Sequence, residues 1–132
     1  MTKKYRILIV EDGAEWVKMH KKLLDEIFEE NPPKIDVCFS ARDGFVKALS
    51  DSYDLIITDL EMEKILGESY AGAWFLKNVT GREQFKNTKF LIISGAYDIT
   101  DIAMLYKVDH ISKSSLINNP ILLKYKLENM LG

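Results

Sequence analysis

Near its middle the chain reads Asp54-Leu55-Ile56-Ile57-Thr58-Asp59-Leu60-Glu61-Met62. The aliphatic run within this stretch predicts a short strand that is buried on both faces, as strands of parallel sheets are. A carboxylate, Asp59, follows at the point where that strand would end. The stretch therefore predicts both a class of fold and the place where polar groups gather on it.

The same pattern recurs along the chain. Apolar runs predict strands at residues 7–10, 35–39, 55–57, 90–93 and 108–111. Apolar residues at helical spacing predict helices over 16–28, 45–49, 74–79 and 99–106, and Asn119-Pro120 predicts the start of a last helix that runs to Leu131. Five βα units in succession predict a doubly wound α/β fold with five parallel strands in the flavodoxin-like order 2-1-3-4-5. They use residues 1–132, which predicts one domain.

Composition excludes several classes of protein. The net charge of -2 argues against a nucleic-acid binder. Cys38 is the only cysteine, so no intrachain disulfide is expected. The first apolar run is interrupted at Glu11 and Asp12, which makes it too short for a signal peptide, and no stretch approaches membrane-spanning length. We expect a cytoplasmic protein without membrane insertion.

Polar groups follow the predicted strands. Strand 1 leads into Glu11 and Asp12, and strand 3 leads into Asp59, with Glu61 just beyond. In the expected order these two strands are neighbours, so their carboxylates meet at the crevice where open α/β sheets bind ligands. Clustered carboxylates repel one another, so either some of them are protonated or a cation joins them, and carboxylate oxygens suit Mg²⁺. The sequence therefore predicts a Mg²⁺ site.

The remaining strand ends add a hydroxyl and an ammonium. Strand 4 ends at Ser94, and Lys113 follows strand 5. A carboxylate such as Asp59 can be a nucleophile that forms an aspartyl phosphate. Lys113 would neutralise the oxygens of that phosphoryl group and Ser94 would donate a hydrogen bond to it, which is most of what phosphoryl transfer requires.

These residues give the chain a resemblance to the receiver domains of two-component response regulators. The matches occur in the family's order: residues 7–12, Ala41 with Gly44, Ala48 and Leu49, residues 54–62, residues 92–96, and Lys113. The resemblance implies that Asp59 accepts a phosphoryl group from a histidine kinase or a histidine phosphotransfer protein. It implies Mg²⁺ ligation by Asp12, Asp59 and the backbone carbonyl of Glu61, with Glu11 acting mainly through water.

The resemblance also implies a switch. Lys113 contacts the phosphoryl group, Ser94 is the switch hydroxyl, and His110 stands where the family usually has an aromatic switch residue. Phosphorylation then changes the face formed by helix 4, strand 5 and helix 5. The resemblance implies no enzymatic turnover beyond the protein's own phosphorylation and slow loss of phosphate. The downstream partner is not identified, and a homodimer is left open.

Three departures from the family pattern concern the loops. Lys113-Ser114 replaces a Lys-Pro step whose peptide bond is generally cis in the family, so either isomer is open here. Gly72 is expected to open helix 3, which leaves an extended loop at 64–71. The glycine that usually closes helix 4 is replaced near Tyr106.

Other interpretations remain. The fold could serve as a phosphorylation-independent pseudo-receiver that only binds proteins, or as a flavodoxin-like cofactor binder or phosphatase. Glu11 and Asp12 could simply favour the start of a helix through its dipole. His20 is expected to fill space beside a helix and not to bind a ligand.

Overall fold

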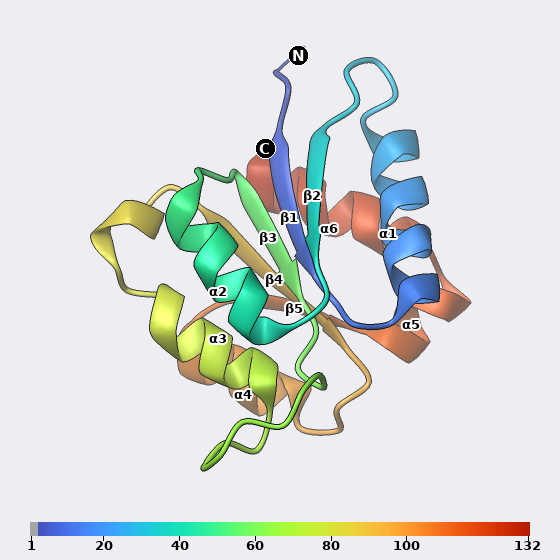
Figure 1. The fold of residues 1–132 in the computed structure, drawn as a ribbon. Helices are drawn as coiled ribbons and strands as arrows, with labels where there is room; N and C mark the ends of the chain where they lie inside the picture. The colour runs from blue at the N-terminus through green and yellow to red at the C-terminus, as the bar shows by residue number, and fades with distance from the viewer. Residues whose placement is uncertain (1–2) are drawn as a thin grey trace.

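Five parallel strands form one sheet in the computed structural model, which describes residues 3–132 (Figure 1). The strands are β1 (Arg6–Val10), β2 (Lys34–Cys38), β3 (Leu55–Thr58), β4 (Lys89–Ser94) and β5 (Asp109–Ser112). Their order is β2-β1-β3-β4-β5 and every pair is parallel. The predicted fold class and strand order are confirmed.

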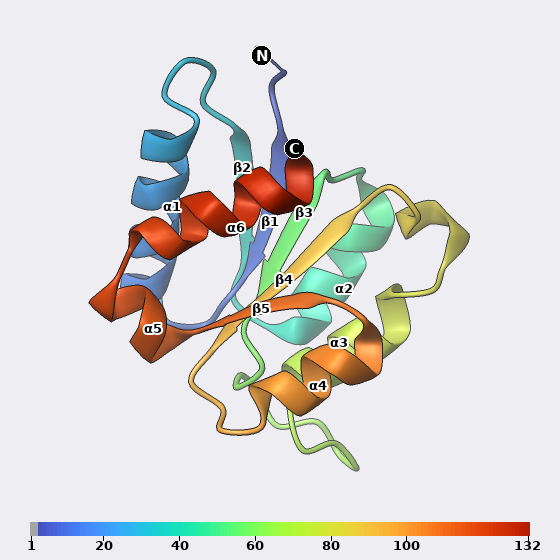
Figure 2. The same cartoon turned by 180° about the vertical axis from the view of Figure 1, so that it is seen from behind.

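Helices cover both faces of this sheet (Figures 1 and 2). On one face lie α1 (Ala14–Ile27), α5 (Lys113–Asn118) and α6 (Ile121–Leu131); on the other lie α2 (Ala41–Ser50), α3 (Ala71–Val79) and α4 (Ile99–Tyr106). A short 3₁₀ helix, η1 (Glu83–Phe85), precedes β4. Successive residues of β1 alternate between the two cores, Ile7 and Ile9 on the α1 side and Leu8 and Val10 on the α2 side. This alternation is why the run from Ile7 to Val10 is continuously apolar. In the described part of the chain, no helix combines the length and the apolar content needed to cross a membrane.

The strand register decides which polar residues lie side by side where the strands end. Val10 pairs with Thr58, so the next residues, Glu11 and Asp59, emerge side by side. The backbone N–H of Asp59 donates to the carbonyl of Val10 at 3.0 Å, which extends the pairing by one residue. At the far edge Ser112 pairs with Ser94, and Lys113 follows Ser112.

The C-terminal region differs from the prediction. Helix α6 corresponds to the last helix predicted from Asn119 onward, but a further helix, α5, precedes it over residues that were not assigned a helix from the sequence. The hydroxyl oxygen of Ser112 caps α5 by accepting a hydrogen bond from the backbone N–H of Ser115 at 3.1 Å. Pro120 cannot donate a backbone hydrogen bond, so it separates the two helices.

The two loop questions left open by the sequence have structural answers. The Lys113–Ser114 peptide is trans, since no residue of the described range has a cis bond. Helix α4 ends at Lys107, which adopts the left-handed conformation with φ 57° and so takes the place of the usual glycine.

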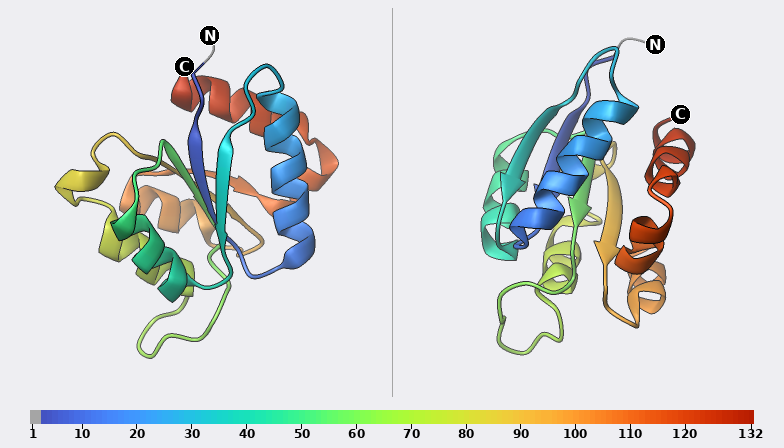
Figure 3. Two further views of the ribbon diagram at one scale, coloured as in Figure 1. Left: turned by 45° about the horizontal axis from the view of Figure 1, so that its top comes forward. Right: turned by 90° about the vertical axis from the view of Figure 1, so that its right-hand side faces the viewer.

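The extended loop between β3 and α3 projects from the edge at which the strands end (Figure 3). The Glu63 carboxylate accepts hydrogen bonds from the backbone N–H groups of Ala41 and Arg42 at 2.8 and 3.0 Å, which caps the start of α2. At the other end of the loop, the Tyr70 hydroxyl donates to Asp98 at 2.7 Å, and this bond raises the pKa of Tyr70 to about 12. The loop is therefore tied to both α2 and the β4–α4 segment.

Candidate functional site

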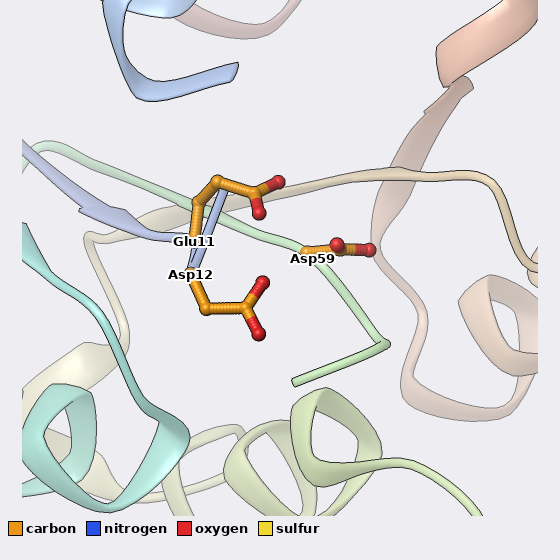
Figure 4. Close-up of side chains that lie close together, drawn as sticks. All are labelled: Glu11, Asp12 and Asp59. Carbon is orange, nitrogen blue, oxygen red and sulfur yellow. The ribbon is translucent and has the colours of Figure 1, made fainter. Parts of the chain in front are cut away.

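Three carboxylates converge where β1 and β3 end. Glu11, Asp12 and Asp59 each offer an oxygen, and these oxygens lie within 4.8 Å of one another (Figure 4). The side chains of Glu11 and Asp59 are buried, at 2% and 3% exposed, whereas Asp12 is open to solvent. The structure thus brings together the acidic residues that the sequence predicted would meet at this crevice.

Lys113 joins the two buried carboxylates. Its Nζ lies 2.8 Å from Asp59 Oδ2 and 2.9 Å from Glu11 Oε1. Burial disfavours the charged ammonium, but the hydrogen bonds and charges of Asp59 and Glu11 outweigh burial and raise the pKa of Lys113. The ammonium is therefore charged at neutral pH and belongs to the site.

Backbone groups orient the acceptor carboxylate. Asp59 Oδ1 accepts hydrogen bonds from the backbone N–H of Leu60 at 2.7 Å and that of Glu61 at 3.3 Å. The other oxygen, Oδ2, faces Lys113. The carboxylate is held at both oxygens before any ligand arrives.

The charges in this cluster do not balance. Glu11 and Asp59 pair with the ammonium of Lys113, and Asp12 adds a third carboxylate, so the cluster holds more carboxylates than cationic groups. Burial raises the pKa of Glu11, and the nearby charge of Asp59 adds to this effect against the opposing influence of Lys113 and the Gly13 N–H. A divalent cation would relieve the imbalance, and a set of carboxylate oxygens is the donor set that Mg²⁺ prefers.

The other predicted site residues lie around this cluster. Ser94 is fully buried at the end of β4, and its hydroxyl oxygen accepts a hydrogen bond from the backbone N–H of Ala96 at 3.2 Å. His110 lies half-buried on β5, where its Nε2 is joined to the Thr100 hydroxyl of α4 at 3.2 Å. Glu61 follows Asp59 with its side chain exposed. The roles assigned to these residues, including that of the Glu61 carbonyl, remain predictions.

Two aromatic residues of α1 were not assigned to the site from the sequence. The Trp16 ring lies under the Lys113 ammonium, with 4.8 Å between Nζ and the ring centroid. The His20 ring lies tilted beside Trp16, with 5.9 Å between the ring centroids, and His20 is 1% exposed, so it fills space in the interior. The i, i+4 spacing of Trp16 and His20 would have placed both on the inward face. The contact of Trp16 with Lys113 depends on how α1 packs, which spacing does not reveal.

The burial of His20 predicts a pH dependence of stability. Burial and the charge of Lys113 lower the pKa of His20 to about 4, against a smaller opposing effect of Asp59. The unfolded chain binds this proton near pH 6.5, so between these pH values it holds more protons than the folded chain. The free energy of unfolding should therefore fall by about 2–3 kcal/mol as the pH drops from 7 to 4 on account of this one residue.

Urea denaturation between pH 7 and pH 4 measures this effect. His20→Phe keeps a ring beside Trp16 and removes the titrating group, so its stability should fall less steeply than that of the wild type. His110→Asn, which removes the only other histidine, is the control. Equal slopes for His20→Phe and His110→Asn would show that the burial of His20 has no such consequence.

Among known proteins, those similar to this chain were found by comparing structures and not by comparing sequences. No family model and no curated protein sequence matches the chain. Among solved structures, the phosphorylated cyanobacterial phytochrome response regulator RcpA is similar with a TM-score of 0.75 and 16% identity, over 96% of this chain and 92% of that one.

Two further structures are similar over nearly the whole chain. A CheY-like response regulator receiver domain from Methylobacillus flagellatus has a TM-score of 0.68 and 24% identity, with 92% of this chain and 98% of that chain covered. The response regulator TrrA from Thermotoga maritima, in complex with Mg²⁺-BeF, has a TM-score of 0.68 and 25% identity, with coverage of 95% and 97%. Together with the strand order and the acidic cluster, these neighbours establish that the chain has the CheY-like fold of response regulator receiver domains.

Proposed function

We propose that the chain is a phospho-accepting receiver domain, and that Asp59 accepts a phosphoryl group from a cytoplasmic histidine kinase or histidine phosphotransfer protein. One observation carries the proposal. The Asp59 carboxylate is buried between Asp12 and Lys113, and backbone N–H groups hold it from a third side. A carboxylate that served only to end a strand would need none of these partners.

The transfer requires little chemistry beyond positioning. One Asp59 oxygen attacks phosphorus, and the new P–O bond forms as the P–N bond of the donor histidine breaks. The electron pair of that bond leaves with the imidazole, which takes up a proton. Lys113 then moves one of its N–H donors from Asp59 to an oxygen of the phosphoryl group, and Ser94 donates its hydroxyl hydrogen to another.

The carboxylates of this cluster fit Mg²⁺ in unequal ways. Glu11 already has partners at both oxygens, Lys113 at Oε1 and the Gly13 N–H at Oε2. Asp12 is solvent-exposed, so it would hold the ion directly. By the resemblance to receiver domains, Asp59 would also ligate the ion directly, and Glu11 would act mainly through water. The bound ion would supply charge neutralisation for the transferring phosphoryl oxygens. The complex of the similar TrrA with Mg²⁺-BeF supports this assignment.

The contacts around Ser94 and His110 offer a route from the site to a surface. A shift of Ser94 toward the phosphoryl group would pull on the β4–α4 segment. That segment contains Asp98, which is bound by Tyr70, and it leads into α4, whose Thr100 is bound by His110. The phosphoryl group would thereby favour one of two arrangements of the α4–β5–α5 face. No turnover beyond self-phosphorylation and slow loss of phosphate is proposed.

Incubation with acetyl phosphate tests the proposal. With Mg²⁺ the wild-type protein should gain the mass of one phosphoryl group, and hydroxylamine should remove it because an acyl phosphate is labile to this nucleophile. EDTA should prevent the labelling. Beryllofluoride with Mg²⁺ should change the NMR spectrum around Asp59, Ser94 and Lys113. A protein that neither takes up phosphate nor responds to beryllofluoride would instead be a phosphorylation-independent binding module.

A further inference from the structure

The first turn of α1 brings an indole ring to the ammonium of Lys113. Trp16 is the third residue of this helix, and its ring centroid lies 4.8 Å from Lys113 Nζ. Gly13 lies directly against the ring: a Cβ at this position would be in van der Waals contact with Trp16 Cδ1 at 3.4 Å and would lie 3.2 Å from Glu11 Oε2. The buried ring of His20 lies beside the indole, with 5.9 Å between the ring centroids. The indole is therefore packed in place beside the acidic cluster.

The geometry around the ammonium leaves a distinct role for this ring. An ammonium has three N–H donors, and one of them goes to Asp59 Oδ2 at 2.8 Å, while Glu11 Oε1 forms an ion pair with Nζ at 2.9 Å. The face of an indole attracts a cation through its quadrupole, more strongly than phenyl or phenol rings do. It does so without accepting a strong hydrogen bond, so it leaves the N–H donors for anionic oxygens.

We propose that Trp16 is a positioning residue for Lys113, whose ammonium it holds over the acceptor while the partner oxygens change. This inference rests on the proposed function. When Asp59 gains a phosphoryl group, Lys113 must exchange a carboxylate oxygen for a phosphoryl oxygen. A lysine side chain loses rotamer entropy when it is ordered. The indole restricts the ammonium throughout the exchange, since its attraction does not depend on which oxygen is bound.

Fluorinated tryptophans separate the electrostatic role from packing. Trp74→Phe leaves Trp16 as the only tryptophan, which can then be replaced biosynthetically by mono-, di- and trifluorinated analogues. Fluorine weakens the attraction of the ring face for a cation but changes the ring's shape little. At saturating Mg²⁺, the rate of labelling by acetyl phosphate should fall stepwise with fluorine number, by about three- to tenfold across the series. Trp16→Phe should be slower than the parent, and Trp16→Leu slower still.

A second measurement tests the contact without phosphorylation. The ε-methylene protons of Lys113 should be shifted upfield by the indole ring current in the Trp74→Phe parent, and this shift should vanish in Trp16→Leu. Equal labelling rates across the fluorinated series, or the absence of the ring-current shift, would overturn the positioning role. Failure of the proposed function looks different, since then the wild type and every variant would remain unlabelled while the ring-current shift persists.

Discussion

Asp59→Asn is expected to reduce labelling by acetyl phosphate to background while the protein stays folded. The amide is not a nucleophile, so no acyl phosphate can form at this position. Its oxygen still accepts the hydrogen bonds that Leu60 and Glu61 donate to the carboxylate. Lys113 keeps Glu11 as a partner, and one of the three repelling carboxylates is removed. We therefore expect a free energy of unfolding within about 1 kcal/mol of the wild type in the absence of Mg²⁺.

The same strand provides a matched control for this variant. Asp54 lies just before β3, as Asp59 lies just after it, but Asp54 binds the backbone N–H of Arg6 and the ammonium of Lys3 instead of the acidic cluster. Asp54→Asn should be labelled at the wild-type rate. Mass spectrometry of the intact proteins, with and without hydroxylamine, gives the comparison. Labelling of Asp59→Asn at the wild-type level would place the acceptor elsewhere and refute the assignment.

The fold could be predicted because the sequence patterns that indicate its strands and helices are local and recur along the chain. The strands β1, β3 and β4 contain apolar runs that are followed by polar side chains, and the connections between strands contain apolar residues at helical spacing. Parallel pairing then requires Glu11 and Asp59 to emerge at one edge, since Val10 and Thr58 are paired. The meeting of these two carboxylates therefore follows from sequence pattern and topology, without knowledge of side-chain packing.

The contacts that were missed depend on packing between distant elements. Nothing in the spacing of Trp16 shows that its ring will lie under Lys113, nearly a hundred positions later in the chain. The same is true of Glu63, whose carboxylate caps α2 from an extended loop. Burial opposes ionisation of this carboxylate, but the two N–H groups outweigh it and lower the pKa of Glu63. In contrast, the start of α5 could have been predicted from the sequence, because Ser112 precedes the helix and serine is a preferred N-cap residue.

Gly72→Ala is expected to cause the largest loss of stability among single methyl additions to the glycines of this chain. Gly72 is the second residue of α3, one position from where the sequence placed the helix start. A Cβ here would lie 2.0 Å from the carbonyl oxygen of Asp59 and 2.7 Å from the Cα of Leu60. Both are backbone atoms, and the Gly72 N–H already donates to the Leu60 carbonyl at 3.0 Å. The clash therefore cannot be relieved by the rotation of a side chain.

Two other glycines allow the expected loss of stability in Gly72→Ala to be compared with milder cases. At Gly44 a Cβ would meet the methyl groups of Val10 at 2.8 and 2.9 Å, which are side-chain atoms that can shift slightly. At Gly95 the nearest atom would be Glu61 Oε1 at 3.7 Å, an ordinary contact. Urea denaturation should show losses in the free energy of unfolding of about 3 kcal/mol for Gly72→Ala, about 1 kcal/mol for Gly44→Ala and under about 0.5 kcal/mol for Gly95→Ala.

The contact at Gly72 also ties helix α3 to the chemistry. Alanine is ordinarily better than glycine within a helix by up to about 1 kcal/mol, so a net loss must come from the contact with the backbone of Asp59 and Leu60. Relieving that contact requires α3 to retreat or the backbone of residues 59–60 to move, and the second response displaces the N–H groups that orient the acceptor carboxylate. In the absence of urea, and at a temperature at which Gly72→Ala remains folded, acetyl phosphate should therefore label Gly72→Ala more slowly than Gly44→Ala. If Gly72→Ala were as stable and as rapidly labelled as Gly95→Ala, α3 would not approach Asp59 as closely as this structure places it.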